Sequence, residues 1–333
     1  MPTETAGPAA DVGTPVHHEI PLTILTGFLG AGKTTLLNHL LTADHGLRIA
    51  VLVNDFGSIN IDAELVVGVE ENMMSLANGC VCCEIRDDLI EAVEQLVTLE
   101  VPPEHLVLEA SGVADPASIW ATFAGSQHPE WLRLDGVTCV VDCDQIFRNL
   151  DEEQDLLMLK ARQIAFADLV VLNKVDLAGP DMLAWIRQWI DTMMDKVRIV
   201  EAVRGEVPLD VLLGAGRDPA SSADSEQHHD HDHGSRFSTW TYETDRVFDE
   251  AVLREMIRKD LPGSVYRCKG FAWVEGSDGL QRMVLQSVAR RCELTSAPPS
   301  GPEGARSRIV AIGTADLDEV ELRRAFDGCL VAD

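Results

Sequence analysis

Cysteine, basic residues and long apolar runs are all scarce in this chain of 333 residues. Its eight cysteines are too few for the disulfide framework that stabilises small secreted domains. Lys and Arg total 27 against 55 Asp and Glu, a formal charge of −28, which repels nucleic acid and anionic membranes. No apolar run approaches the roughly 20 residues of a membrane-spanning helix, and the first residues lack the features of a secretory signal. We therefore expect a cytoplasmic protein that binds neither nucleic acid nor membranes.

The chain is long enough for two domains, and its composition suggests where they lie. Residues 1–18 are rich in Pro, Ala, Gly and Thr, which predicts a flexible tail. Over residues 19–213, short apolar runs alternate with amphipathic stretches, which predicts an α/β domain with a doubly wound, mostly parallel sheet. Residues 214–236 are polar and low in complexity, as is typical of a linker. Residues 237–333 combine consecutive strand patterns with flanking helices, which predicts a smaller α+β domain.

Residues 27–34 fit the phosphate-binding pattern G-x-x-x-x-G-K-[ST], after a predicted strand and before a predicted helix. Glycines let backbone N–H groups turn inward around phosphate oxygens, and the helix N-terminus adds its positive dipole. Lys33 brings a charge for the β and γ phosphates, and Thr34 brings a hydroxyl for Mg²⁺. We expect the nucleotide contacts to come from Gly27, Gly30, Ala31, Gly32, Lys33, Thr34 and Thr35.

Asn173, Lys174 and Asp176 form the sequence N-K-x-D after another predicted strand, and this resembles the base-recognition motif of GTPases. An ionised Asp176 accepts two hydrogen bonds from the N1–H and the exocyclic amine of guanine. Adenine presents the opposite pattern and leaves the carboxylate unpaired. We therefore expect GTP as the ligand, and this motif argues against an ATP-dependent kinase or ligase.

Several acidic residues follow strand patterns near the expected phosphate site. Glu109 closes a strand, where its carboxylate holds a Mg²⁺-bound water or orients the attacking water. We assign catalysis to Lys33, Glu109 and Asp55, and we expect Asp55 and Glu109 to join Thr34 at Mg²⁺. Asp55 and Asp62 are candidates for a switch that senses the γ phosphate. The same carboxylates can instead cap helices or face solvent.

Asp142, at the end of another predicted strand, is a weaker candidate for sensing the γ phosphate. Cys139 lies within that strand, where we expect it to fill a small apolar position.

Cys80, Cys82 and Cys83 place three sulfurs within four residues, and Gly79 permits a tight turn there. Thiolates are soft ligands that suit Zn²⁺ or Cu(I), and Zn²⁺ accepts a fourth ligand from a His, a carboxylate or water. A redox pair and a buried apolar role are the alternatives. Adjacent cysteines are poorly placed to bridge each other, so we expect these thiols to bind a metal.

Histidines outside this cluster are weaker candidates. The run HHDHDH at residues 228–233 either collects metal for the thiols or is a solvated spacer. The residues alone favour neither interpretation. His17, His18 and His128 are expected at the surface, with His128 a candidate for the fourth zinc ligand.

The segments GFLGAGKTT, NDFG with NID, NGCVCC, EASGVADP and NKVD, in this order, resemble the CobW-type P-loop GTPases, relatives of UreG and HypB. SVYRCKG and SRIVAIG resemble segments of that family's C-terminal domain. The resemblance implies a GTP-hydrolysing metallochaperone that uses GTP, Mg²⁺ and Zn²⁺, binds zinc through Cys80, Cys82 and Cys83, and delivers it to a client apo-metalloprotein. Family members commonly have Glu where this chain has Asp55 and Ser58, so the loss of a carboxylate at Ser58 weakens the case for a second metal site.

The loop between Asp55 and Asp62 leads into the cysteine segment, so we expect hydrolysis to change the geometry of the sulfurs. One alternative is a zinc buffer or sensor whose nucleotide site is regulatory. Another is cobalt or iron supply to an enzyme such as cobaltochelatase or nitrile hydratase. The client and a homodimeric state stay open at this stage.

Overall fold

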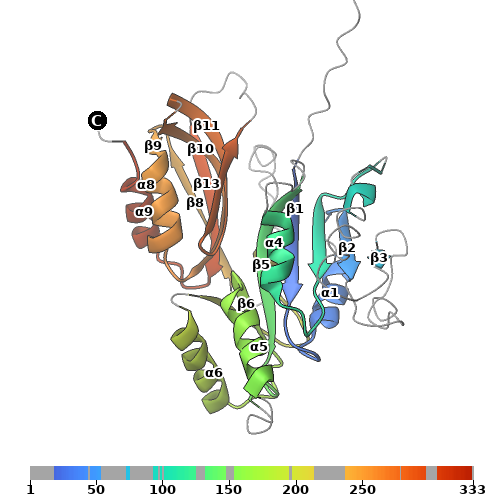
Figure 1. The fold of residues 1–333 in the computed structure, drawn as a ribbon. Helices are drawn as coiled ribbons and strands as arrows, with labels where there is room; N and C mark the ends of the chain where they lie inside the picture. The colour runs from blue at the N-terminus through green and yellow to red at the C-terminus, as the bar shows by residue number, and fades with distance from the viewer. Residues whose placement is uncertain are drawn as a thin grey trace, which may run out of the picture.

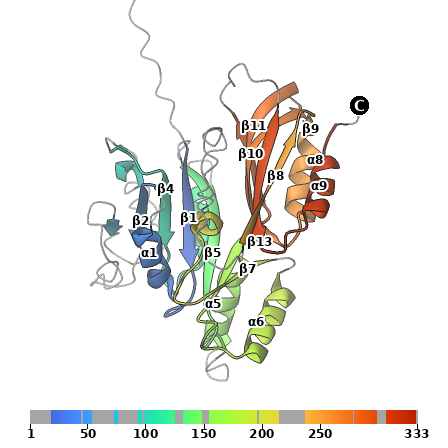
Figure 2. The same cartoon turned by 180° about the vertical axis from the view of Figure 1, so that it is seen from behind.

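The computed structural model describes residues 19–43, 46–53, 73–75, 93–96, 98–99, 101–124, 132–147, 154–194, 197–213, 237–277, 279–297 and 306–331. Within these ranges the chain forms two β-sheets with helices packed on them (Figures 1 and 2). The expected tail, residues 1–18, and the expected linker, residues 214–236, lie outside the described residues, so these boundaries stay predictions. No helix in the described ranges has the length and apolar character needed to cross a membrane.

The first sheet is parallel and has seven strands in the order β3-β2-β4-β1-β5-β6-β7. Its strands are β1 (Ile20–Thr26), β2 (Ile49–Val53), β3 (Met73–Ser75), β4 (His105–Glu109), β5 (Leu132–Asp142), β6 (Leu169–Asn173) and β7 (Arg198–Ala202). Every residue of β2, β4 and β6 is buried, as expected for strands covered on both faces. The prediction of a doubly wound parallel sheet is confirmed.

Helices cover both faces of this sheet. They are α1 (Lys33–Thr42), α4 (Pro116–Ala124), α5 (Gln154–Ala165), α6 (Pro180–Met193) and α7 (Leu209–Leu213). α1 and α7 pack on one face through a core that includes Leu37 and Val211. α4, α5 and α6 pack on the other face through Ile119, Ile164 and Ile186. The loops at the carboxyl ends of the strands therefore lie between two helical layers, where α/β sheets bind ligands.

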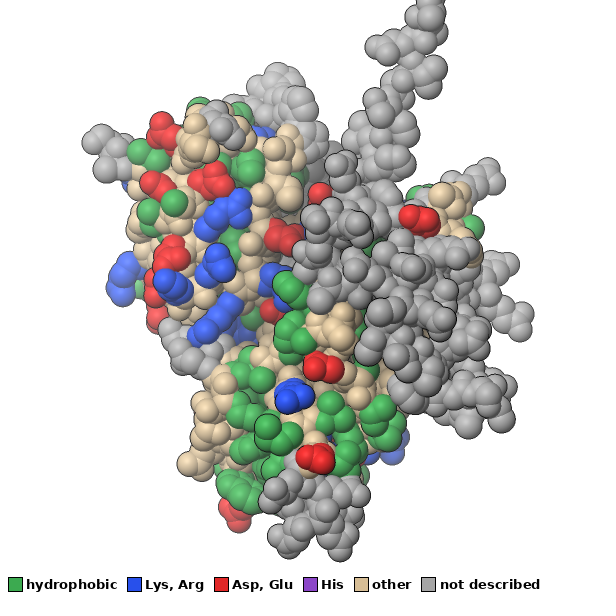
Figure 3. All heavy atoms as spheres, in the orientation of Figure 1, with side chains coloured by type: hydrophobic (Ala, Val, Ile, Leu, Met, Phe, Trp, Pro, Cys, Tyr) green, Lys and Arg blue, Asp and Glu red, His purple; other side chains and the backbone are tan. Residues whose placement is uncertain are grey.

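The outer faces of α5 and α6 are partly apolar. Hydrophobic side chains gather there in Figure 3, and Met158 of α5 and Trp185 of α6 are more than half exposed. The ring of Phe147 packs against Trp185 with centroids 4.5 Å apart. This contact shields part of the apolar surface from water.

The second sheet has six strands and is antiparallel except where β9 pairs with β10. Its strands are β8 (Phe237–Thr244), β9 (Phe248–Asp249), β10 (Val265–Gly276), β11 (Gly279–Val288), β12 (Arg291–Ser296) and β13 (Ser307–Thr314). Helix α8 (Glu250–Glu255), a π-helical turn over Met256–Asp260 and helix α9 (Glu319–Asp327) cover one face (Figure 1). Their buried side chains include Leu253, Ile257 and Phe326. The expected α+β unit is confirmed.

Residues 248–259 do not form one continuous α-helix. Phe248 is fully buried and pairs with Val274 of β10, so the segment begins as a strand. Asp249 then caps α8, because its carboxylate accepts a hydrogen bond of 3.0 Å from the backbone N–H of Val252.

The second sheet packs against the amino ends of β5, β6 and β7. Arg267 of β10 forms an ion pair of 2.8 Å with Asp135 of β5, and Arg291 of β12 forms one of 2.9 Å with Asp168 just before β6. Arg198, the first residue of β7, donates to backbone carbonyls that precede and begin β10. The contacts between the two units therefore lie at the opposite end of the parallel sheet from the loops that follow its strands.

Candidate functional site

The phosphate loop joins β1 to α1, and its shape depends on two glycines. Gly27 and Gly32 have φ values of 138° and 102°, a region that side chains other than glycine rarely adopt. A Cβ atom at Gly27 would lie 2.2 Å from the carbonyl oxygen of Val140, and one at Gly32 would lie 2.3 Å from the Asn173 side chain. Only glycine fits either position, because β5 and β6 approach the loop so closely.

Lys33 begins α1 and turns back into the loop. Its ammonium donates to the carbonyl oxygens of Gly27 at 2.9 Å and Phe28 at 3.4 Å. The residue is buried, which is rare for a lysine. The loop thus holds a positive charge within the curve where a phosphate group would bind.

Thr34 and Glu109 meet at the carboxyl ends of β1 and β4. The Thr34 hydroxyl donates to Glu109 Oε1 at 3.3 Å, and Glu109 is only 2% exposed. Hydroxyl and carboxylate oxygens are the hard ligands that Mg²⁺ prefers. The donor set therefore fits Mg²⁺ beside the phosphate loop, and binding of Mg²⁺ by these two residues stays a prediction.

Asn173 connects three loops through its side chain. The residue is buried at the end of β6, where its Nδ2 donates to the carbonyl of Ala31 at 2.9 Å. Its Oδ1 accepts from the backbone N–H of Gly205 at 3.0 Å. The amide thus holds the phosphate loop to the loop after β7, and the expected contact of Asn173 with the nucleotide stays a prediction.

Lys174 lies across the phosphate loop. Its ammonium donates to the carbonyl oxygen of Gly30 at 2.8 Å and to Asp142 Oδ2 at 2.6 Å. Its backbone has a φ of 62°, a left-handed conformation that is uncommon for a residue other than glycine. This strained position is kept where the surrounding contacts are strong, as they are here.

Both carboxylate oxygens of Asp142 accept hydrogen bonds. Oδ2 binds Lys174, whereas Oδ1 accepts from the backbone N–H groups of Asp144 and Gln145 at 2.9 and 3.1 Å. The sequence suggested Asp142 as a sensor of the γ phosphate. In the structure its carboxylate pairs with the lysine of the N-K-x-D motif, and a role in sensing the γ phosphate stays a prediction.

Asp176 lies in the turn after β6 and its side chain is exposed. The N–H of Leu177 donates to the carbonyl of Lys174 at 3.0 Å and closes this turn. The carboxylate is thus accessible at the same edge of the sheet as the phosphate loop, as recognition of a base requires.

Gly205 was missed by the sequence analysis. It has a φ of 73°, and a Cβ atom there would lie 2.8 Å from the backbone nitrogen of Leu36 in α1. Gly205 lies three residues after the end of β7, and a glycine soon after a strand pattern is a turn signal. Gly205 allows the loop after β7 to approach both α1 and Asn173.

The thiol of Cys139 lies behind the phosphate loop. Burial raises its pKa to about 12, although the nearby charge of Lys33 acts in the opposite direction. The group is therefore a neutral thiol at physiological pH. The expected apolar role of Cys139 is confirmed.

Thr35 lies in the first turn of α1 and is exposed. The remaining predicted site residues lie outside the described part of the chain. They are Asp55, Asp62, Cys80, Cys82, Cys83, His17, His18, His128 and the histidines of 228–233. Their assignments stay predictions. Among the residues that the structure does describe, no three His, Cys, Asp or Glu side chains are grouped so as to hold a metal ion.

Comparison with known families matches both units. Residues 21–201 match the model of the CobW/HypB/UreG nucleotide-binding domain. The chain belongs to the CobW/HypB/UreG family. Residues 237–330 match the C-terminal domain of the cobalamin synthesis protein CobW, so this family member carries both units.

Several characterised relatives cover nearly the whole chain. The zinc chaperone CobW of a Sinorhizobium species is 32% identical over 92% of this chain and 96% of its own length. The zinc-regulated GTPase metalloprotein activator 1 of Dictyostelium discoideum is 30% identical, over 95% of this chain and 80% of its own. The crystal structure of the Zn(II)-bound YjiA GTPase from E. coli is 27% identical, with a TM-score of 0.47, and covers 94% of this chain and 99% of its own.

Proposed function

We propose that this chain is a GTPase that binds Zn²⁺ through Cys80, Cys82 and Cys83 and delivers it to a client metalloprotein. The observation that carries the nucleotide half is the joining of the phosphate loop to the N-K-x-D motif through Asn173 and Lys174. The zinc half is supported by the three clustered thiols of the sequence and by relatives described as zinc chaperones.

The described residues support a definite division of labour in GTP binding. Lys33 would contact the β and γ phosphates, while Thr34 and Glu109 would hold Mg²⁺. When bound, Mg²⁺ neutralises charge on the phosphate oxygens. Glu109, buried at the end of β4, is also the group that we propose to orient the attacking water.

Recognition of guanine rests on one exposed carboxylate. Asp176 would accept hydrogen bonds from the base, while Asn173 and Lys174 hold the surrounding loops. A base that presents an acceptor to this carboxylate would leave it unpaired, which favours GTP over ATP.

Coupling between the two sites is the mechanistic core of the proposal. The γ phosphate would favour one conformation of the loop from Asp55 to Asp62, and that loop leads along the chain to the thiols. Coupling is reciprocal, so a tenfold rise in zinc affinity with GTP requires a tenfold rise in GTP affinity with zinc, about 1.4 kcal/mol. We also propose a client apo-metalloprotein as partner, self-association as a homodimer, and action in the cytoplasm, where thiols stay reduced.

The test is a competition titration of Zn²⁺ against a chromophoric chelator, with a GTP analogue, with GDP and without nucleotide. We expect different zinc affinities in the three states. Cys82→Ser should weaken zinc binding strongly, whereas the control Cys292→Ser, in β12 of the second sheet, should leave it unchanged. One affinity in all nucleotide states would favour the zinc buffer or sensor instead. Native affinity in the Cys82 variant would show that the ligands are wrong.

A further inference from the structure

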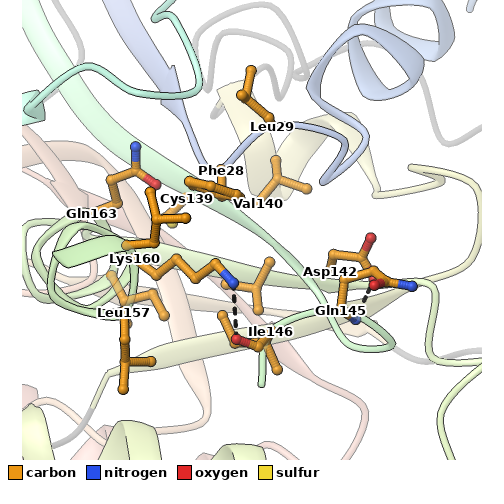
Figure 4. A pocket seen from close by; sticks show the side chains of 13 residues that line it. Phe28, Leu29, Cys139, Val140, Asp142, Gln145, Ile146, Leu157, Lys160 and Gln163 are labelled. Atoms are coloured by element: carbon orange, nitrogen blue, oxygen red, sulfur yellow. Dashed lines mark hydrogen bonds between the residues drawn. The ribbon is translucent and has the colours of Figure 1, made fainter. Parts of the chain in front are cut away.

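A pocket of about 240 Å³ lies behind the phosphate loop (Figure 4). Phe28 and Leu29 of the loop form one wall, the end of β5 forms another, and α5 closes the far side. A dry cavity of about 150 Å³ is large enough to hold benzene. This pocket therefore has room for a bicyclic molecule.

Most of the pocket lining is apolar. Leu29, Ile146, Leu157 and Ile164 all face it, and the Cys139 thiol beside them is neutral because burial raises its pKa to about 12. A neutral thiol neither binds a metal nor attacks an electrophile. The lining therefore favours an apolar molecule, whose transfer from water into the pocket is favourable, over an ion.

Gln163 contributes a hydrogen-bond acceptor without a partner. Its Nε2 donates to the carbonyl oxygens of Gly112 at 3.1 Å and Ala114 at 3.2 Å, which fixes the orientation of the amide. Its Oε1 is buried and has no hydrogen-bond partner in the described structure. In Figure 4 this oxygen points toward Phe28 and Cys139. A buried acceptor left in this way is unfavourable until a donor reaches it.

Lys160 and Asp142 are the charged residues that line the pocket, and the Asp142 carboxylate is already paired with Lys174. The Lys160 ammonium donates to the carbonyl oxygen of Ile146 at 3.0 Å and lies 4.8 Å from the centre of the Phe28 ring (Figure 4). The contact holds the ring face toward α5. A fixed positive charge at this wall disfavours a cationic ligand.

We propose that this pocket binds a small, uncharged, flat molecule with one N–H or O–H donor directed at Gln163 Oε1. The site is separate from the proposed contacts to guanine at Asp176 and to Mg²⁺ at Thr34 and Glu109. Because Phe28 and Leu29 belong to the phosphate loop, binding of this molecule is linked to binding of nucleotide.

Two probes of equal shape test the proposal on the native chain. Indole has an N–H donor, and benzofuran has a ring oxygen in its place. In calorimetric titrations we expect indole to bind about five- to tenfold more tightly, because only indole supplies a donor to Gln163. Equal affinities, or no binding of indole at millimolar concentration, would overturn the proposal without any variant.

Variants locate the binding to this pocket. Leu157→Trp fills the pocket from α5 and should abolish binding of both probes. The matched control Met158→Trp changes the neighbouring residue, which is 57% exposed, and should leave binding intact. Gln163→Leu should make the two affinities equal. Native indole binding in the Leu157 variant, or a preserved preference for indole in the Gln163 variant, would show that the probe binds elsewhere.

The link to nucleotide is measured separately. The affinity for a fluorescent GDP analogue should change at least twofold when indole is saturating, and the indole affinity should change by the same factor when GDP is saturating. An unchanged GDP affinity would overturn the link.

Discussion

Replacing Arg267 with Met should destabilise the protein strongly, because the guanidinium neutralises a buried carboxylate across the two units. Arg267 and its partner Asp135 are 6% and 5% exposed, and their atoms lie 2.8 Å apart. The guanidinium also donates to the backbone carbonyls of Val211 and Leu212 at 2.6 and 2.5 Å. The substitution leaves one buried charge and two carbonyl oxygens without this donor.

Two routes give the size of the effect. Removing one partner of a buried ion pair costs about 3–5 kcal/mol. Burial alone would raise the pKa of Asp135, yet the charges of Arg267 and Arg133 bring it down to about 2, from an ordinary 3.8. A depression of that size is worth roughly 2 kcal/mol at neutral pH. We expect a loss of about 2–5 kcal/mol in the free energy of unfolding.

The assay is urea unfolding followed by circular dichroism at several pH values. Since the folded pKa of Asp135 is depressed, its contribution is present above pH 3.8 and is lost as pH falls toward 2. The difference between native and variant should therefore narrow in acid. The control Arg306→Met removes an ion pair to Glu243 whose arginine is 62% exposed, and should cost less than about 1 kcal/mol. Equal losses for both variants would refute the reasoning.

Three further outcomes follow from the same contacts. Asp142→Asn removes the anionic partner of Lys174 and should weaken binding of a fluorescent GTP analogue about tenfold; unchanged affinity would contradict the positioning role. Asp176→Asn should reduce the preference for GTP over XTP at least tenfold in competition binding, and an unaltered preference would count against the base assignment. Burial lowers the pKa of His105 to about 4, so the folded state takes up fewer protons than the unfolded state and stability should fall as pH drops from 6.5 to 4. His105→Gln, in urea titrations at pH 7 and 5, should remove most of this fall; an equal fall in the variant would exclude His105 as its source.

Features of the fold and of the site could be predicted from the sequence where they depend on residues close together along the chain. The phosphate loop could be predicted because its glycines, Lys33 and Thr34 lie within eight consecutive residues of one motif. The parallel sheet could be predicted because strands buried on both faces carry runs of apolar residues, such as all five residues of β2 and residues 106–108 of β4. Each of these two patterns spans only a few consecutive residues.

Contacts between distant residues were not predictable in this way. Arg267 was placed in a recognised segment of the sequence, yet nothing there indicates that it pairs with Asp135, 132 positions away. Asp142 looked like other acids at strand ends, and only the folded neighbourhood shows that Lys174 occupies one of its oxygens. The first contact depends on how the two sheets pack against each other. The second depends on β5 and β6 being neighbours in the parallel sheet. A single sequence reveals neither arrangement.

Strand β5 connects two regions that the sequence patterns describe separately, the second unit and the surroundings of the phosphate loop. Near the beginning of β5, Asp135 forms an ion pair with Arg267 of the second unit. At the end of β5, Asp142 binds Lys174 beside the phosphate loop. A shift of the second unit along β5 would therefore act on the lysine that lies over the loop. If binding of a client moves the second unit, nucleotide affinity changes with it, and by linkage the nucleotide alters affinity for the client by the same factor. Such a linkage would need no contact between client and nucleotide, because β5 touches the second unit at Asp135 and Lys174 at Asp142.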